Sequence, residues 1–259
     1  MTGTFGAGST ERQPTVPHLR VIGPGRAGHS LAGALRHHGW DLHPFIARGD
    51  DLVDAAHGTD VLAIATPDGV IADVAAAVEP VETTLVVHLA GSLPADVLAP
   101  HPRRGAMHPL MTLPDADTGT RRLIDGVAWA VDGHGETDEL AAVLSDRVYR
   151  VDAADRTRYH AAAAIASNHL VALAGQVESV SDGIGVPLDA YLDLMAASIE
   201  NVRSHGVRDG LTGPAARGDV DTIERHLAEL PADERGTYVT LAEQAARIAG
   251  RELDLVVPR

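Results

Sequence analysis

A glycine-rich turn near the start of the chain carries the most specific chemical signal. Its residues fit the pattern GxGxxG and are Gly23, Pro24, Gly25, Arg26, Ala27 and Gly28. An apolar run precedes the turn, and apolar residues at helical spacing follow it, which is the context of dinucleotide-binding turns. Gly23 would permit the tight turn, Gly25 the approach of a pyrophosphate and Gly28 close helix packing. The alternative is a glycine turn in an α/β fold that binds no ligand.

The residue type after the second predicted strand, residues 41–47, bears on the choice of cofactor. An NAD-binding domain usually has an acidic residue there, about 20 residues after the glycine turn. This chain has Arg48, whose planar guanidinium suits the 2′-phosphate of NADP. Asp50 and Asp51 follow and are an alternative ribose ligand, and Arg48 could equally be a solvated loop charge. We predict NADP and leave NAD open.

Three further strand ends contribute polar residues. Thr66 and Pro67 follow the third strand and are predicted to skirt the cofactor ribose, although a plain strand-to-helix turn explains them equally well. His88 and Ser92 follow the fourth strand, and His108 the fifth. In open parallel sheets ligands bind beyond the carboxyl ends of the strands. We therefore assign His88, Ser92 and His108 to the substrate, against the alternative of hydrogen-bonded structural histidines.

A polar face is predicted on the first helix after residue 152. At about 100° per residue, Ser167 lies about 20° and Asn168 about 80° around the axis from His160. Alanines separate the three, so another surface can come close. We predict His160, Ser167 and Asn168 as catalytic residues, with His160 as the general acid because its pKa can lie near neutrality. Hydrogen bonding to neighbouring helices is the alternative.

A glycine-proline loop at residues 211–219 leads into a later helix. Arg217 in this loop is predicted to hold a substrate carboxylate, or else to be a solvated charge. Asp219 is explained by capping of the helix that follows.

The elements that position these residues fall into two regions. Up to about residue 152, short apolar runs alternate with helical patterns, which predicts a doubly wound parallel sheet of the Rossmann type. Beyond it the pattern is helical, with almost no strand signal. We therefore predict an α/β fold with a disordered tail at 1–17, a Rossmann domain at 18–152 and an all-helical domain at 153–259 for substrate binding and dimerisation.

Composition excludes several kinds of chemistry. The 259 residues include no cysteine, and all 21 basic residues are arginine, so thiolate, Schiff-base and Walker-lysine chemistry are ruled out. A formal net charge of −15 argues against nucleic acid or an anionic membrane as partner. The chain shows neither a long apolar run nor a signal-peptide pattern, and a cytoplasmic location is expected.

Five motifs give the chain a family resemblance: GPGRAG, HLAGS, HPL, YHAAAAIASNHLVAL and LTGPAARGD. Together they resemble the Rossmann-like proteins with a C-terminal domain of unknown function 2520, over nearly the whole chain after residue 18. That family is similar to the 6-phosphogluconate dehydrogenase C-terminal-domain-like superfamily, which includes ketopantoate reductases, β-hydroxyacid dehydrogenases, pyrroline-carboxylate reductases and deazaflavin-dependent NADP reductases. The resemblance implies a nicotinamide cofactor and a homodimer.

One family feature is missing. Ketopantoate reductases and β-hydroxyacid dehydrogenases carry a lysine, and an asparagine four residues later, on the first helix of the second domain. Here Ala164 stands four residues before Asn168, and the nearest ionisable side chain on that helix is His160. That lysine–asparagine pair is therefore not carried over to this chain.

The function predicted from the sequence is NADP-dependent hydride transfer to or from a small keto acid, hydroxy acid or imine. The missing lysine motivates one alternative, an NADP-binding sensor or scaffold without turnover. A second is a metal site made of His88, His108 and His160, since imidazole suits zinc or iron. We predict no metal.

Overall fold

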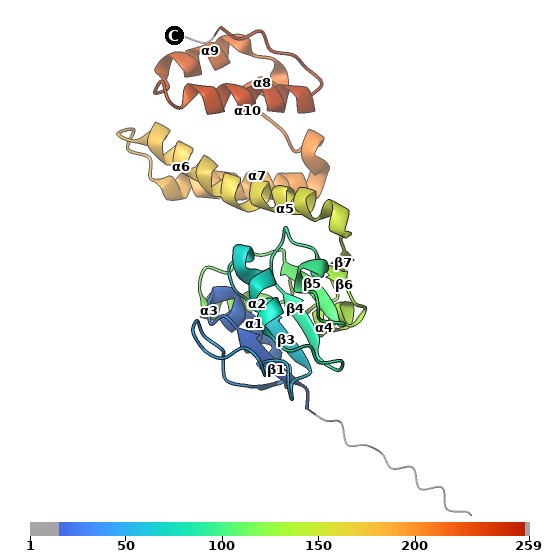
Figure 1. The fold of residues 1–259 in the computed structure, drawn as a ribbon. Helices are drawn as coiled ribbons and strands as arrows, with labels where there is room; N and C mark the ends of the chain where they lie inside the picture. Colours follow the sequence, from blue (N-terminus) through green and yellow to red (C-terminus); the bar gives the residue numbers. More distant parts are fainter. Residues whose placement is uncertain (1–15, 257–259) are drawn as a thin grey trace, which may run out of the picture. The chain divides into compact units, whose positions relative to one another are not determined.

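The computed structural model describes residues 16–256, which divide into two compact units between Ile165 and Ala166. Of the predicted tail at 1–17, only the last two residues lie within the described part. The first unit contains every strand of the sheet, and the helices after Ile165 belong to the second (Figure 1). The predicted domain limits at 17 and 152 stay a prediction.

The first unit is built on a seven-stranded sheet. Its order is β2-β1-β3-β4-β5-β6-β7. The strands are β1 His18–Ile22, β2 Asp41–Leu42, β3 Val61–Ile64, β4 Leu85–His88, β5 Arg104–Pro109, β6 Trp129–Gly133 and β7 Val148–Arg150. The predicted Rossmann-type α/β fold is confirmed.

The sheet is mostly, not wholly, parallel, because β6 pairs antiparallel with β5. The reason lies in the connection between them. The Leu110 N–H donates to the Ala128 carbonyl (2.8 Å), so β6 begins at the edge where β5 ends. The chain thus re-enters the sheet without crossing to its far edge, and β7 then runs parallel to β6.

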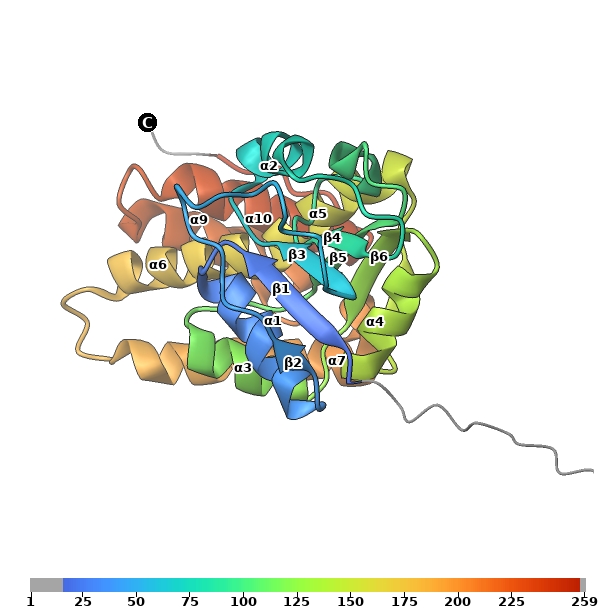
Figure 2. The same ribbon diagram turned by 60° about the horizontal axis from the view of Figure 1, so that its bottom comes forward.

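Each central strand is buried on both faces and supplies alternate residues to two cores. Leu19, Val21 and Val61 belong to a core shared with α1 (Arg26–His37), α3 (Ala116–Ile124) and α4 (Glu136–Leu144). Ile22 and Leu62 point into a second core, with α2 (Ile71–Ala77) and a 3₁₀ turn at Ala95–Leu98. Figure 2 shows α1 and α3 on one side of the sheet and α2 on the other. This two-residue alternation explains the continuous apolar runs of the sequence.

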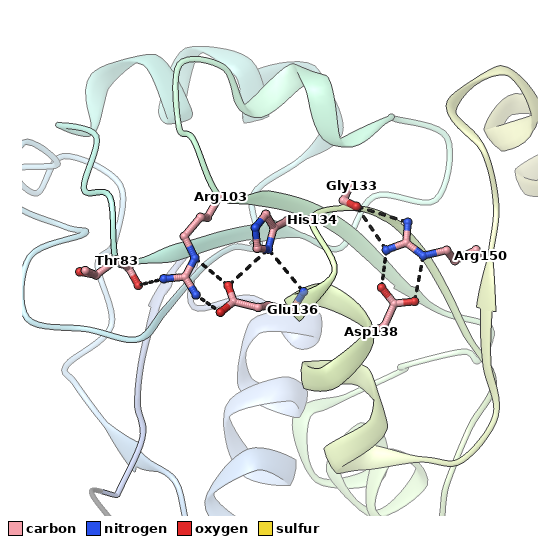
Figure 3. A network of polar contacts seen from close by, with 7 residues as sticks. All are labelled: Thr83, Arg103, Gly133, His134, Glu136, Asp138 and Arg150. Carbon is pink, nitrogen blue, oxygen red and sulfur yellow. Dashed lines mark hydrogen bonds and ion pairs between the residues drawn. The ribbon is translucent and has the colours of Figure 1, made fainter.

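Two arginine–carboxylate pairs fix the first turn of α4 at one edge of the sheet (Figure 3). Arg103, just before β5, donates to the Thr83 carbonyl (2.7 Å) and pairs with Glu136. Arg150, at the end of β7, donates from Nε to Asp138 (3.0 Å). Acidic side chains in a first helical turn also stabilise the positive end of the helix dipole. This edge holds the amino end of β5, opposite the strand ends predicted to bind ligands.

The first helix predicted after residue 152 is interrupted. α5 (Arg156–Ala164) passes into a π-helical segment at Ile165–His169, and α6 (Leu170–Ser181) follows. A π segment turns fewer degrees per residue than an α-helix, so regular α-helical spacing does not hold between His160 and Asn168. The predicted common face of His160, Ser167 and Asn168 therefore rested on a wrong geometry.

The second unit is helical, as predicted for the C-terminal part. After α6 it contains α7 (Leu188–Asp209), α8 (Pro214–Arg217), α9 (Val220–Glu229) and α10 (Arg235–Ile248). Asp219 caps α9 by accepting the Thr222 N–H (3.2 Å), as its position predicted. Among residues 16–256, none of the helices is both long and apolar enough to cross a membrane.

Candidate functional site

The glycine turn after β1 has one closed side and one open side. A Cβ on Gly23 (φ +99°) would lie 2.7 Å from the Ala65 carbonyl oxygen, and one on Gly28 would lie 2.3 Å from the Gly23 carbonyl oxygen. The backbone of the turn thus packs against β3 and α1 so tightly that neither position accepts a side chain. A Cβ on Gly25 would meet nothing within 4 Å. Gly25 therefore leaves open space beside the N-terminus of α1, where backbone N–H groups attract anions.

A cavity of about 640 Å³ adjoins this turn. It lies where the chain leaves β1 toward β2 on one side and β3 on the other, the switch point at which open α/β sheets bind ligands. Six of the nine predicted cofactor residues line it: Gly23, Pro24, Gly25, Arg48, Thr66 and Pro67. The other three, Arg26, Ala27 and Gly28, form the first turn of α1.

Two details of this cavity fit a dinucleotide. The Thr66 hydroxyl is buried and has no hydrogen-bond partner among residues 16–256, so a ligand can supply one. Asp50 accepts the Ala47 N–H (2.7 Å) and Asp51 accepts the Val53 N–H (3.0 Å). Both carboxylates thus stabilise their own loop. Arg48 and Asp50 are both exposed at the cavity, and of the two Asp50 already accepts a backbone hydrogen bond. This geometry favours Arg48 over Asp50 or Asp51 as the group that contacts the cofactor ribose.

His88, at the end of β4, has a structural environment. Its side chain is fully buried, its Nδ1 accepts the Ala90 N–H (3.2 Å) and its Nε2 faces the Pro94 carbonyl (3.2 Å). Burial lowers its pKa from 6.5 to about 4, so the ring is neutral. Both ring nitrogens are occupied by the backbone. We therefore no longer assign His88 to the substrate, and it cannot join His108 and His160 in a metal site.

His108 and His160 lie close together, and Tyr159, which directly precedes His160 in the chain, contacts His108. The His108 Nδ1 lies 2.7 Å from the Tyr159 hydroxyl, and the His108 and His160 ring centroids are 5.6 Å apart. His160 also packs on the loop after β4, because a Cβ on Gly91 would lie 2.3 Å from its Nδ1. That nitrogen is buried and has no partner among the described residues. The carboxyl ends of β4 and β5 thus meet the start of α5.

Arg156 is a fully buried cation beneath this cluster. Its Nη2 donates to the Ala90 carbonyl (3.2 Å), and its guanidinium carbon lies 6.0 Å from the centroid of the Tyr159 ring. Its Nε and Nη1 are buried without a partner in the part of the chain that the structure describes. Sequence reasoning missed Arg156 and Tyr159 as site residues. The available signal was spacing, because residues three and four apart share a helix face. Tyr159 and His160 follow Arg156 by three and four residues on α5.

Burial sets the protonation of the cluster. It lowers the pKa of His108 to about 4, with further lowering from His160, Arg156 and His88. Burial raises the pKa of Tyr159, and the Arg156 charge opposes that rise. At neutral pH His108 is therefore neutral and Tyr159 protonated.

The remaining predicted site residues are not brought into this cluster. The hydroxyl of the half-buried Ser92 lies 3.5 Å from a carboxylate oxygen of the exposed Asp68. In the second unit, the Ser167 hydroxyl donates to the Asn168 side-chain oxygen (2.9 Å). Arg217 lies 3.9 Å from Asp219 in a loose ion pair. The structure thus assigns no ligand to Ser167, Asn168 or Arg217.

Comparison with known proteins identifies a domain and a fold. Residues 129–245 match the model of a domain of unknown function, DUF2520. No curated protein matches the chain.

Three solved structures share the fold. A Bacteroides fragilis protein assigned as an NADP oxidoreductase is 21% identical, with a TM-score of 0.72 over 90% of this chain and 98% of that one. A Thermotoga maritima protein is 20% identical, with a TM-score of 0.70 over 90% and 98%. A reductive aminase from Aspergillus terreus, solved with NADPH and ethyl-5-oxohexanoate, is 14% identical, with a TM-score of 0.68 over 93% and 97%. This chain thus combines a Rossmann-like fold with a DUF2520 match over residues 129–245.

Proposed function

We propose that this protein is an NADP-dependent oxidoreductase that transfers hydride between NADP(H) and a small keto acid, hydroxy acid or imine. The observation that carries the proposal is the open space at Gly25, which continues into a cavity with Arg48 at its wall. In support, a structural relative with this fold was solved with NADPH. Its identity of 14% carries no substrate to this chain.

The proposed cofactor contacts follow from the cavity. The N–H groups at the start of α1 would hold the pyrophosphate, Arg48 the 2′-phosphate and Thr66 a ribose hydroxyl. Asp50 remains hydrogen-bonded to its own loop. When bound, the nicotinamide would supply or accept the hydride. NAD remains an alternative cofactor, because the preference for NADP over NAD depends on Arg48 alone.

The substrate is proposed to lie beyond the carboxyl ends of β4 and β5. His108 and His160 would flank it, and Ser92 would contribute a hydroxyl. The predicted roles of Ser167, Asn168 and Arg217 toward the substrate stay predictions from the sequence.

We also propose a cytoplasmic homodimer. The observation behind the dimer is apolar surface left exposed on the second unit. Val171 on α6 is 72% exposed and Leu194 on α7 is 64% exposed. A second copy of the chain that covers these helices would bury that surface.

The test of the proposed function is calorimetric titration with NADPH and NADH, followed by turnover assays on keto acids and imines. We expect tight NADPH binding, weaker NADH binding and oxidation of NADPH with at least one substrate. Binding without turnover across the panel would favour the sensor alternative. Binding of neither nucleotide would show that the glycine turn is structural.

The open space at Gly25 gives a sharper test of the cofactor site. A Gly25→Ala variant should keep the melting temperature of the wild type, because its Cβ meets nothing within 4 Å. The methyl group would nevertheless occupy the space proposed for the pyrophosphate, so the Kd for NADPH should rise about tenfold or more, or at least about 1.4 kcal/mol. Gly135→Ala is the matched control, because Gly135 is equally open but lies at the start of α4, and its Kd should not change. An unchanged Kd in Gly25→Ala would place the pyrophosphate elsewhere.

A further inference from the structure

We propose that Tyr159 is the catalytic acid of this site, with His108 and Arg156 as the residues that position it and stabilise its phenolate. The inference rests on the proposed function, since it assigns the proton donor for that reduction. It moves this role from His160 to the residue before it.

The hydrogen bond between Tyr159 and His108 is the first argument. Only one proton lies between the two atoms, which are 2.7 Å apart. With His108 in its neutral Nδ1–H tautomer, the ring donates to the phenol oxygen, and the phenol hydrogen is left for another acceptor. The same donor then stabilises the phenolate once that hydrogen has been transferred.

Charge is the second argument. Arg156 lies over the Tyr159 ring, and among the described residues no carboxylate lies within ion-pair distance of its fully buried guanidinium; Asp132 acts on it from farther away. Such a charge is costly to bury unless a negative charge compensates it. A Tyr159 phenolate formed during turnover would place a negative charge beside Arg156.

The other charged groups around Tyr159 are largely neutralised. Tyr159 lines a cavity of about 390 Å³ together with Arg150, Asp152, Asp155 and Arg158. Arg158 pairs with Asp155 (2.7 Å), and Arg150 pairs with Asp138 on α4. Asp152 is the remaining carboxylate of that lining, and Asp132 acts on Arg156 at longer range. The neutral His108 and the ring of His160 lie near the phenol. Arg156 is thus the unpaired cation beside the phenol.

His160 is less suited to donate the proton. Its Nδ1 is buried against Gly91 and has no hydrogen-bond partner in the described chain. His160 fits a ring that shapes the substrate space.

For a carbonyl substrate, NADPH when bound would supply the hydride for a new C–H bond at the carbonyl carbon, and the C=O π electrons would move to oxygen. The oxygen takes the Tyr159 hydroxyl proton, which leaves NADP⁺, an alcohol and a Tyr159 phenolate. The phenolate would then take a proton from solvent, which the cavity that its ring lines can admit. For an imine, nitrogen takes the place of oxygen.

The test uses the full chain and the substrate found in the panel. Tyr159→Phe removes the hydroxyl and keeps the ring. It should lower kcat by about 10²–10⁴-fold, the range for loss of a general acid, while the Kd for NADPH stays unchanged. Tyr149→Phe is the matched control, because Tyr149 is 57% exposed on β7 and should retain full activity.

The pH profile of the wild type is a second measurement that does not depend on the variant folding. A tyrosine donor predicts that kcat/KM falls only in the alkaline range, near or above about pH 10, whereas a histidine donor predicts a fall from about pH 6.5. A fall near pH 6.5, or wild-type turnover in Tyr159→Phe, would overturn the assignment. No turnover by the wild type on any substrate would instead refute the proposed function, and this role with it.

Discussion

Replacement of Arg48 by glutamate is expected to change the nucleotide preference of the protein more than any other single surface substitution. A charge-assisted, bidentate contact to the 2′-phosphate contributes about 1.5–3 kcal/mol, which is about 10–150-fold in Kd. The new carboxylate would in addition repel the phosphate. NADPH affinity should therefore fall by about 100-fold or more, and NADH affinity should change little because NADH lacks that phosphate.

Calorimetry with both nucleotides measures this difference. Arg36→Glu is a suitable control, because it changes the net charge by the same amount as Arg48→Glu. Arg36 is an exposed residue at the end of α1 and does not line the cavity. It should affect both nucleotides slightly and equally. If Arg48→Glu also weakens the two nucleotides equally, Arg48 does not contact the 2′-phosphate, and the preference for NADP loses its basis.

Mild acid is expected to destabilise the first unit strongly. Burial holds the pKa of His88 near 4, whereas the unfolded chain has about 6.5, so below pH 6.5 the unfolded state takes up protons first. Stability is therefore complete above pH 6.5 and is lost as the pH falls toward 4. For His88 alone the loss between pH 7 and pH 5 is about 2 kcal/mol. Burial lowers the pKa of His101 and His108 too, so their contributions have the same sign.

Urea unfolding at pH 7 and pH 5 measures this loss. The carboxyl groups with lowered pKa values, Asp115 and Asp219, titrate below pH 3.8 and so do not contribute in this range. His88→Asn keeps a donor and an acceptor for the Pro94 and Ala90 backbone but does not titrate. It should lose about 2 kcal/mol less than the wild type over the same interval. An equal loss in both proteins would show that His88 is not the buried, neutral group described here.

The sequence by itself determined the class of the fold and the nucleotide-binding turn. Both depend on local rules, because a two-residue apolar alternation produces buried strands and a glycine turn before a helix has one stable geometry. Gly23, Gly25 and Gly28 occupy the positions that the pattern predicted, and Arg48 and Thr66 line the adjoining cavity. The helical character of the C-terminal region also followed from periodicity.

Only the tertiary structure decided which side chains share a site. His108 and Tyr159 are far apart in the chain, and their hydrogen bond exists because β5 ends beside the start of α5. Likewise, burial made His88 structural, and it left Arg156 as an unpaired cation, neither of which residue type alone reveals. Because of the π segment at Ile165–His169, the helix does not have the ideal α-helical spacing from which a common face of His160, Ser167 and Asn168 was predicted. Sequence patterns record local backbone preferences, whereas the partner of a side chain is set by packing between distant segments.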